Sequence, residues 1–536
     1  AENIFKNKYA QGPNDTWDAL ADRLVEDVCG SRWGKDKPLM SQEDRDCLAQ
    51  YIKEMKFVPG GRYLWYAGRG NSYFNNCFLL RAEEDTREEW ANLTQRAVSC
   101  LMTGGGIGVD YSILRPSGKP LTRTGGLSSG PIPLMQMLNE VGRGVMQGGS
   151  RRSAIYASLN WLHEDIPAFL TSKNWSDEIK AMKDKDFNAV APLDMTNISV
   201  NYDDKWLHNA DRANLHTFVE NCRQAMMTGE PGFSFNFGDK QNETLRNACT
   251  EVTSEDDSDV CNLGSINISN VSSLEEFKHI VELGSKFLVC GTLRADLPYD
   301  KVYKVREKNR RLGLGLMGIH AWLLQRGQGY EVTPELHEWL KVYKNESERS
   351  ANEHCERLFI SKPVAYRAIA PTGSIGILAG TTTGIEPLFA VAYKRRYLTD
   401  GTKWKYEYVV DTTADQLIKE YGLDPNKIET AYGLSHDYEK RLKFQADIQD
   451  YVDMSISSTI NLPSWGSKDN NEGCVTKFAE TLSRYAPRLR GFTCYPDGSR
   501  GGQPLTEVPY EEAIKHKGTV FEENIDRACV SGVCGI

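Results

Sequence analysis

Apolar residues recur at three- and four-residue spacing in several long stretches of the chain, which is the spacing of one face of an α-helix. The first 58 residues carry two such stretches, and the proline and glycines at 59–61 end the pattern. We therefore expect an N-terminal helical segment over residues 1–58 and further helices later in the chain. The pattern predicts helices at 17–29, 42–55, 206–227, 273–295 and 333–359.

Short apolar runs between polar turns predict strands. Residues 75–80 lead from a polar turn into an apolar run, and residues 260–268 alternate as a strand does. The run at 312–318 has regular glycines, which suits a close-packed helix or strand, and 491–502 indicates a strand that enters a turn. The length of 536 residues allows two to four ordinary domains or one large α/β barrel with appendages.

The glycines at 103–108 lack the spacing of a dinucleotide-binding fingerprint. Glycine allows a backbone to pass close to a ligand or to another strand, and this is the interpretation we favour here. A second glycine-rich stretch, 148–152, ends in Arg151 and Arg152. It is either a solvated basic turn or a phosphate-binding loop.

Composition narrows the class of protein. The 536 residues are 40% apolar and 26% charged, with a formal net charge of −9, which argues against a general nucleic-acid binder. No run approaches the roughly 18 apolar residues of a membrane span, and the mixed N-terminus does not resemble a secretory signal. The 13 cysteines are scattered, so we expect reduced thiols and a cytoplasmic location, in a host cell if the source is a virus.

The stretch 247–251 alternates functional and small residues. It places an amide, a thiol and a carboxylate at Asn247, Cys249 and Glu251. In an extended strand these side chains share one face, and in a tight loop they converge on one point. Either geometry gathers a redox centre, a base and a hydrogen-bonding group, although alone the stretch also fits a polar turn with a buried cysteine.

Two further motifs carry chemistry. The turn at 371–375 offers free backbone N–H groups and hydroxyls that suit phosphate oxygens without a lysine. Cys529 and Cys534 lie on a glycine-containing tail, and their spacing differs from that of zinc knuckles. A redox shuttle is therefore the better interpretation of the tail, and we expect no metal site within the chain.

These motifs, together with 76–79, 103–108, 147–152, 261–263 and 497–502, resemble those of the catalytic (large) chain of ribonucleotide reductases. The resemblance implies a ten-stranded α/β barrel of two antiparallel five-stranded halves with a finger loop inside that carries Cys249. We expect the barrel to occupy residues 59–505 and a flexible redox-active tail to occupy 506–536.

The resemblance also implies residue roles. Cys249 resembles the residue that becomes a thiyl radical, Glu251 the base on the 3′ hydroxyl, and Asn247 the amide that holds the ribose hydroxyls. Cys77 and Cys261 resemble the pair that reduces the 2′ carbon. Cys529 and Cys534 resemble the pair that re-reduces it and is recharged by thioredoxin or glutaredoxin. The implied phosphate-binding residues are Pro371, Thr372, Gly373, Ser374 and Ile375.

The radical source is the main alternative that the motifs leave open. Family members with a separate metal-containing small subunit carry two adjacent tyrosines before the tail, whereas this chain has Cys494 and Tyr495. The stretches 103–108 and 497–502 are more similar to the adenosylcobalamin-dependent class, which we prefer. If a small subunit with a dimetal centre supplies the radical instead, Tyr495 is the candidate relay residue.

The family also implies regulation by deoxynucleotide or ATP effectors at a dimer interface. Candidate effector residues are Asp85, Arg123 and the loop near 183–196. Fewer than eighty residues precede Cys77, so we expect no N-terminal ATP-binding regulatory domain. We expect a homodimer.

Two functions of other classes fit parts of the sequence. A non-radical thiol–disulfide oxidoreductase would use Cys529 and Cys534 alone, and a nucleotide-binding regulatory protein would use the glycine loops. Neither explains why Asn247 and Glu251 flank Cys249.

Overall fold

A computed structural model describes residues 1–145, 153–186, 189–399, 403–499 and 505–522. The first half of its central sheet consists of five strands in which each neighbouring pair is parallel. All five strands consist almost entirely of buried residues, as expected for parallel strands that are covered on both faces. They are β2 (Cys77–Arg81), β3 (Gly106–Asp110), β4 (Ile155–Asn160), β5 (Thr196–Tyr202) and β6 (Gly232–Phe235).

The second half begins with β9 (Asp259–Asn267) and β10 (Leu312–Met317), which are parallel to each other. Parallel bridges from Leu314 to Arg367 and from Ile369 to Ile456 continue the order towards β14 (Gly491–Phe492). The two halves run antiparallel where β2 meets β9 and where β6 meets β14. This arrangement is the expected ten-stranded α/β barrel.

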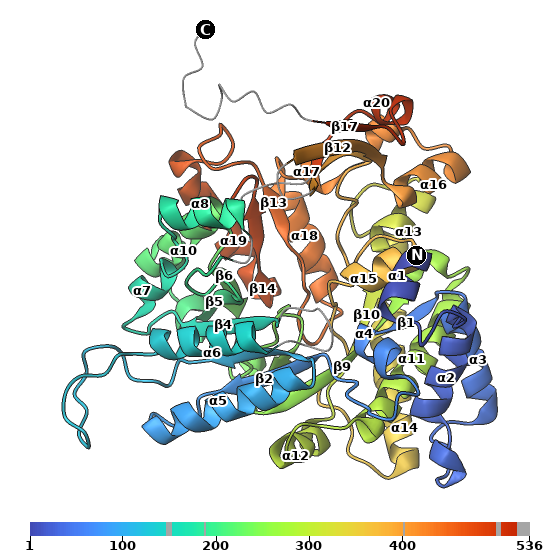
Figure 1. Ribbon diagram of the computed structural model, residues 1–536, viewed down its shortest axis with the longest axis horizontal. Helices are drawn as coiled ribbons and strands as arrows, with labels where there is room; N and C mark the ends of the chain where they lie inside the picture. The colour runs from blue at the N-terminus through green and yellow to red at the C-terminus, as the bar shows by residue number, and fades with distance from the viewer. Residues whose placement is uncertain (146–152, 187–188, 400–402, 500–504, 523–536) are drawn as a thin grey trace.

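Helices pack around the strands, as Figure 1 shows. The helices at 273–295 and 333–359 are confirmed and contact each other along their lengths. The main covering helices are α5 (Arg87–Met102), α6 (Ile132–Gly144), α10 (His216–Thr228), α11 (Leu274–Arg294), α12 (Asp300–Asn309), α14 (Pro334–Leu358), α18 (Tyr438–Gln449) and α19 (Val475–Tyr485).

The N-terminal helices follow the predicted pattern closely. Thr16 and Ser41 accept backbone hydrogen bonds at the starts of α2 (Trp17–Cys29) and α3 (Gln42–Lys53), as helix N-caps do. α2 packs on α3 and on α11, while the short α1 (Glu2–Lys8) contacts α15 (Gly373–Ala379). The chain then enters the main sheet, because β1 (Phe57–Pro59) pairs with β9.

The single helix predicted over 206–227 is wrong. The structure has a short α9 (Asp204–Leu207) and then a break before α10 begins at His216. In the break, Asp211 receives hydrogen bonds from Asn214, and its backbone N–H donates to the Asn209 side chain. Such local side-chain bonds compete with helical bonds and end the first helix.

A separate antiparallel sheet lies at one end of the barrel, at the top of Figure 1. Its strand order is β16-β11-β12-β17, so residues 505–522, which include the start of the predicted tail, pack against a hairpin. Cys529 and Cys534 lie outside the described residues. The elements are β11 (Ala392–Thr399), β12 (Lys403–Val410), β16 (Leu505–Glu507), α20 (Tyr510–Lys515) and β17 (Val520–Glu522).

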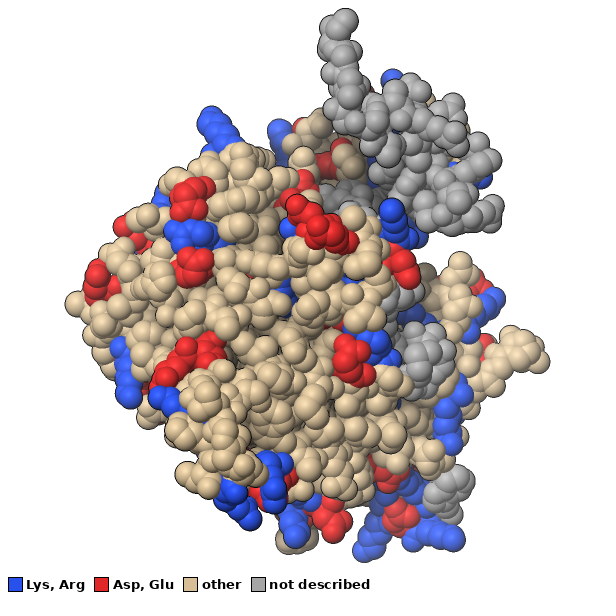
Figure 2. Space-filling view, turned by 60° about the vertical axis from the view of Figure 1, so that its left-hand side comes forward, with Lys and Arg blue, Asp and Glu red and all other residues tan. Residues whose placement is uncertain are grey.

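The surface carries charges of both signs. Figure 2 shows acidic and basic side chains interspersed over the face in view. None of the helices in the described part of the chain has the length and apolar character needed to cross a membrane.

Candidate active site

The stretch 247–251 forms the tip of a short hairpin. β7 (Leu245–Arg246) pairs antiparallel with β8 (Thr253–Ser254), and residues 247–252 connect them. The backbone N–H of Thr250 donates to the Asn247 carbonyl over 3.0 Å, and Thr250 has a positive φ of 70°. Of the two geometries that the sequence leaves open, the structure has the tight loop. We call residues 247–252 the finger loop.

The glycines of β3 make room for this hairpin. A Cβ atom on Gly108 would lie 1.6 Å from the Arg246 carbonyl oxygen, and one on Gly106 would lie 3.3 Å from the Cβ of Ala248. Only glycine fits at position 108 without moving backbone. The interpretation of the 103–108 glycines as a close approach to another strand is therefore confirmed.

Arg246 anchors the base of the finger loop. Its buried guanidinium donates to the Asn236 side chain over 2.8 Å and to the Arg490 carbonyl over 3.1 Å. Burial and the neighbouring Arg490 lower its pKa to about 9. The charge is therefore costly to bury, and the backbone carbonyls around it compensate part of that cost.

Cys77 and Cys261 lie directly opposite each other on the antiparallel strands β2 and β9. Residues directly opposite on paired strands have adjacent Cβ atoms, so the two thiols are neighbours. Asn247 Nδ2 donates to the Cys77 sulfur over 3.1 Å. Burial raises the pKa of Cys77, and nearby Glu251, Cys261 and Cys249 raise it further. The finger loop and the thiol pair therefore share one site.

Cys249 occupies the tip of the finger loop. Its side chain is reached by solvent, yet burial within the barrel, followed by the charge of Glu251, raises the pKa of its thiol. These two observations agree if the sulfur faces an internal space that is large enough for water. A neutral thiol in such a space is accessible to a small ligand.

Glu251 is buried, and its Oε2 atom has no hydrogen-bond partner among the described residues. Burial raises its pKa to about 7, which is near the optimum for a general acid or base. Its carbonyl accepts a hydrogen bond from the Ser455 N–H over 2.8 Å. The finger loop is thus held from both halves of the barrel.

A buried acid beneath the thiol pair was not identified from the sequence. Asp259 Oδ2 accepts hydrogen bonds from Ser254 Oγ at 2.6 Å, Arg311 Nε at 2.7 Å and Asn309 Nδ2 at 2.9 Å. This carboxylate connects β9 to the hairpin that carries the finger loop. The sequence signal for a buried ion pair here is Arg310 and Arg311 before the apolar run at 312. These arginines do not identify Asp259 as the partner.

The turn at 371–375 precedes and opens α15. Thr372 has a positive φ of 52°, and its hydroxyl accepts a hydrogen bond from the Gly384 N–H at 2.8 Å. The Lys8 ammonium donates to the Ser374 hydroxyl over 3.0 Å. The sequence predicts that this turn can hold phosphate oxygens without a lysine, and the fold also brings the Lys8 ammonium to it from the N-terminal helix.

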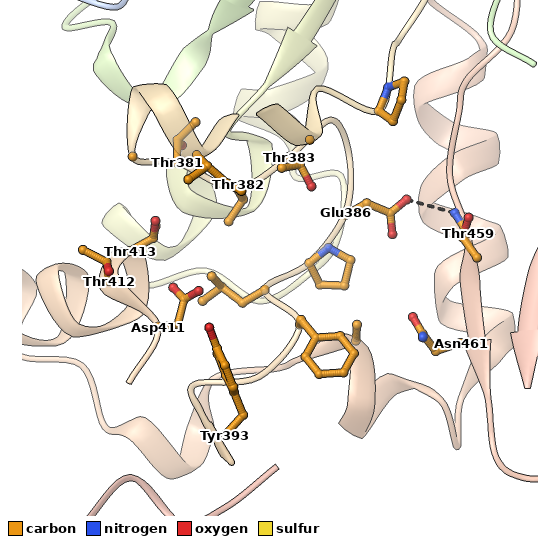
Figure 3. Close-up of a pocket in the computed structure, with 18 of the residues that line it drawn as sticks. Thr381, Thr382, Thr383, Glu386, Tyr393, Asp411, Thr412, Thr413, Thr459 and Asn461 are labelled. Atoms are coloured by element: carbon orange, nitrogen blue, oxygen red, sulfur yellow. Dashed lines mark hydrogen bonds between the residues drawn. The ribbon is translucent and has the colours of Figure 1, made fainter. Parts of the chain in front are cut away.

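A cavity of about 760 Å³ adjoins this turn. In Figure 3 threonine hydroxyls, the carboxylates of Glu386 and Asp411, and Tyr393 surround the cavity. Glu386 accepts a hydrogen bond from the Thr459 N–H over 3.1 Å, and burial raises the pKa of Asp411. Apolar side chains and Tyr495 complete the lining, which gives a site of the size of a ligand pocket.

The segment 455–459 joins the finger loop to this cavity. Ser455 donates to the Glu251 carbonyl, Ser457 donates to the Ile369 carbonyl over 2.8 Å, and Ser457, Ser458 and Thr459 line the cavity. The 760 Å³ cavity therefore lies one short segment away from the thiol site.

The effector candidates Asp85 and Arg123 line one further cavity of about 340 Å³. Asp85 pairs with Arg115 at 2.7 Å, and Arg123 approaches Glu88 at 3.5 Å. Within the 183–196 candidate loop, Lys183 pairs with Asp194 at 2.7 Å, while 187–188 are outside the described residues.

Parts of three sequence motifs are not among the described residues. Arg151, Arg152 and the glycines at 501–502 lie outside the described residues, as do the tail cysteines. Among the residues that the structure describes, no group of three or more His, Cys, Asp or Glu side chains is arranged to hold a metal ion.

Comparison with known proteins identifies related chains. The family model "Ribonucleotide reductase, barrel domain" matches residues 75–221, 218–339 and 364–484. The vitamin B12-dependent ribonucleoside-diphosphate reductase of Mycobacterium tuberculosis is 25% identical, over 97% of this chain and 82% of the relative. A putative adenosylcobalamin-dependent ribonucleoside-triphosphate reductase of Mycobacterium phage D29 is 23% identical, over 100% of this chain and 98% of that protein.

Solved structures support the fold. A crystal structure of a B12-dependent (class II) ribonucleotide reductase superposes with a TM-score of 0.72 at 16% identity. The match covers 96% of this chain and 93% of that chain.

Proposed function

This chain belongs to the ribonucleotide reductase barrel family, and from that membership we propose that it is a catalytic chain that reduces ribonucleotides to deoxyribonucleotides. The observation that carries the proposal is the convergence of three thiols, a carboxylate and an amide. Cys77 and Cys261 face each other across two strands, and the finger loop brings Asn247, Cys249 and Glu251 to the same place.

Each group has a role in the reduction of the ribose. Cys249, as a thiyl radical, takes the 3′ hydrogen, and Glu251 takes the proton of the 3′ hydroxyl. Loss of the 2′ hydroxyl as water needs a proton, which one thiol of the Cys77–Cys261 pair supplies. The pair then gives two electrons and becomes a disulfide, and Cys249 returns the hydrogen to the 3′ carbon. The net change is one ribonucleotide and one dithiol to one deoxyribonucleotide, one disulfide and one water.

The barrel gives this chemistry the protection that it needs. A carbon- or sulfur-centred radical reacts with solvent components, so the site must limit access. The Cys249 thiol faces the internal space of the barrel, where the raised pKa keeps it protonated and thus ready to be oxidised by loss of a hydrogen atom. The unpartnered Glu251 oxygen is available to a substrate hydroxyl.

The substrate phosphates belong at the turn of residues 371–375. Gly373 lines the 760 Å³ cavity, and Lys8 contacts Ser374, so a cation and free N–H groups are close together there. The same chemistry accepts a diphosphate or a triphosphate, and an assay with both substrates distinguishes them.

Adenosylcobalamin is the radical source that we propose, since relatives of this chain carry that dependence in their names. The lining of the 760 Å³ cavity fits part of such a group, because it combines an apolar wall with hydroxyls that suit the amide-bearing rim of a corrin, and the turn at 371–375 is the part proposed for the substrate phosphates. Leu388 and Phe389 would contact the ring, and Thr383 and Ser458 its polar substituents. When bound, the cofactor would supply the oxidising equivalent that converts the Cys249 thiol to its radical.

The test is an assay of the purified chain with ribonucleotide and dithiol, with and without adenosylcobalamin. We expect deoxyribonucleotide only with the cofactor, and none from Cys249→Ser although that variant folds. Product from Cys249→Ser would refute the proposed function. Inactivity with the cofactor, rescued by a metal-loaded partner subunit, would instead favour Tyr495 as a relay residue.

We propose thioredoxin or glutaredoxin as the external reductant and a homodimer as the assembly. Met102 on α5 and Met137 on α6 are 70% and 49% exposed on two helices that contact each other, which suits an interface. Light scattering measures the molar mass of the assembly.

The cavity lined by Asp85 and Arg123 is the proposed effector site. Arg123→Glu should abolish the effect of deoxynucleotides on substrate choice without abolishing turnover.

A further inference from the structure

A second group of cysteines lies among the helices, outside the thiol site of the barrel. Cys29 is the last residue of α2, and Cys290 lies near the end of α11. His354, on α14, approaches Cys290. Both cysteines are fully buried, and the histidine is 2% exposed. Three separate helices thus bring two thiols and an imidazole together.

The contacts in this group are specific. Arg294, one helical turn after Cys290 on α11, donates to the carbonyl of Gly30, the residue after Cys29, over 2.7 Å, so the ends of the two helices that carry the thiols lie together. The two thiols are close enough to influence each other's pKa. His354 Nε2 lies 3.5 Å from the Cys290 sulfur, and His354 Nδ1 is buried without a hydrogen-bond partner among the described residues. A buried imidazole nitrogen without a partner is costly in a structural role alone, because its desolvation is not compensated.

The surroundings favour one thiolate in this pair. Burial by itself would raise the pKa of Cys290, but the neighbouring Cys29 thiol and the His354 imidazole at 3.5 Å lower it below its usual range. Burial, followed by the interaction with Cys290, raises the pKa of Cys29. The imidazole contact therefore marks Cys290 as the sulfur of the pair from which a proton can be removed.

A second buried pair of cysteines shows that burial alone does not lower the pKa of one thiol or bring an imidazole to it. Cys222 and Cys494 are near each other, and burial raises the pKa of both thiols. The Cys494 thiol donates to the Ala225 carbonyl over 3.4 Å. This pair has no imidazole contact among the described residues and serves as a matched control.

We propose that Cys29 and Cys290 are a second redox-active pair, which a low-molecular-weight disulfide oxidises to a disulfide bond between α2 and α11, with His354 as the base. This inference does not depend on the proposed function, because it concerns the redox state of residues outside the reduction site.

The reaction balances with the external disulfide as oxidant. His354 accepts the Cys290 proton, and the Cys290 thiolate attacks one sulfur of the disulfide, which breaks its S–S bond and releases one thiolate. The Cys29 sulfur then loses its proton and attacks the mixed disulfide at Cys290, which releases the second thiolate. The two protons end on the two released thiols. Two protein thiols are oxidised and one disulfide molecule is reduced.

A disulfide bond between Cys29 and Cys290 would affect the thiol site of the barrel. A Cβ on Gly291, the residue after Cys290, would lie 1.7 Å from the Tyr63 hydroxyl, so α11 is in direct contact with Tyr63. That hydroxyl accepts a hydrogen bond from Asn262, which follows Cys261 on β9. A bond that moves α11 therefore acts on the strand that carries one of the two reducing thiols.

Access to the pair runs through the segment that follows α2. The Cys29 carbonyl accepts hydrogen bonds from the Leu39 and Met40 N–H groups, at 2.9 and 3.1 Å. Residues 34–38 between them are exposed. The segment is also held by the ion pair between Arg294 and Asp36, so oxidation of the cysteine pair requires local opening of these contacts.

The test is peptide mapping of the full chain after exposure to oxidised glutathione, with free thiols blocked before digestion. We expect a 29–290 crosslinked peptide in the wild type and none in Cys29→Ala, whereas the 77–261 crosslink forms in both. His354→Gln should form the 29–290 crosslink roughly tenfold more slowly, because the thiolate fraction falls. Circular dichroism establishes that both variants are folded.

Several outcomes would overturn the proposal. They are a 77–261 crosslink without any 29–290 crosslink in the wild type, a 290–355 crosslink in its place, and a 222–494 crosslink that forms as fast as 29–290. A His354→Gln variant that crosslinks at the wild-type rate would remove the histidine from its role. A crosslinked wild type should also melt at a higher temperature than the reduced protein, and Cys29→Ala should show no such rise.

Discussion

The side-chain amide of Asn247 connects the finger loop to strand β2. Its Nδ2 atom donates to the Cys77 sulfur over 3.1 Å, and its Oδ1 atom accepts a hydrogen bond from the Val252 N–H over 2.9 Å. One amide therefore fixes the shape of the loop and the distance of the loop from the thiol pair. This relationship makes Asn247 a positioning group as well as a proposed ligand of the ribose.

Replacement of Asn247 by Ala should lower kcat by roughly 100-fold, since small displacements of reacting groups cost that much. The buried Val252 N–H would lose its acceptor, so the free energy of unfolding should also fall by about 1–3 kcal/mol. Steady-state kinetics and urea titration measure the two effects. Asn214→Ala, at an exposed position, is the control. Wild-type turnover in Asn247→Ala would refute this role.

Glu251 should make turnover depend on pH. Burial raises its pKa to about 7, and the proposed base must be ionised, so kcat should rise as the pH increases through about 7 and then level off. Glu251→Gln should lose activity at every pH. A pH profile of deoxyribonucleotide formation between pH 5.5 and 8.5 is the measurement, and a profile flat below pH 7 would contradict it.

The same residue should lower the stability of the folded chain at neutral pH. Its pKa rises from 4.5 in the unfolded chain to about 7, so the folded state retains a proton that the unfolded state has released. Stability therefore falls as the pH rises between these values, by about 3 kcal/mol in total. Glu251→Gln should be more stable than the wild type at pH 8 and nearly equal to it near pH 4.5. Unfolding by urea at both pH values tests this, with the exposed Glu255→Gln as a control that shows no such difference.

Gly108→Ala should displace the finger loop. The new Cβ would lie 1.6 Å from the Arg246 carbonyl, and backbone must move to remove that clash. We expect a loss of at least about 100-fold in kcat and a destabilisation of about 1–3 kcal/mol. Gly144→Ala, where an added Cβ meets open space at the end of α6, should be neutral or slightly stabilising. Equal activity of the two variants would show that the close approach does not matter.

The C-terminal thiols should be needed for repeated turnover but not for the reaction itself. The double variant Cys529→Ser/Cys534→Ser should stop after about one product per chain when thioredoxin or glutaredoxin is the reductant. It should continue with dithiothreitol, which is small enough to enter the barrel. Product per chain in a rapid-quench assay measures this. Loss of the first turnover in pre-reduced variant would instead favour a non-radical oxidoreductase that uses only the tail.

Local patterns predicted the elements that local forces determine. The bounds of α2 match the prediction, and β9 differs from it by one residue at each end, because capping residues and apolar periodicity define them. The predicted helix at 206–227 is wrong because the Asn209 side chain accepts a hydrogen bond from the Asp211 N–H, which competes with the helical bonds of the backbone. The family and the barrel are confirmed because they depend on motifs distributed along most of the chain.

A single sequence does not predict which distant parts of the chain contact each other. Arg246 donates to the carbonyl of Arg490, which lies 244 positions away, and Lys8 contacts Ser374 across 366 positions. Asp259 and Arg311 form a buried pair at 2.7 Å without any shared motif. Such partners are chosen by the three-dimensional arrangement of the strands, and periodicity does not encode them.

The placement of Cys77 and Cys261 on β2 and β9 has a mechanical consequence. These strands form the boundary between the two parallel halves of the barrel. Under the proposed reaction, every catalytic cycle would close a covalent bond across that boundary and every recharge would open it. The two halves would thus alternate between a disulfide-linked and an unlinked state. A larger force should be needed to separate the halves in the oxidised protein than in the reduced protein.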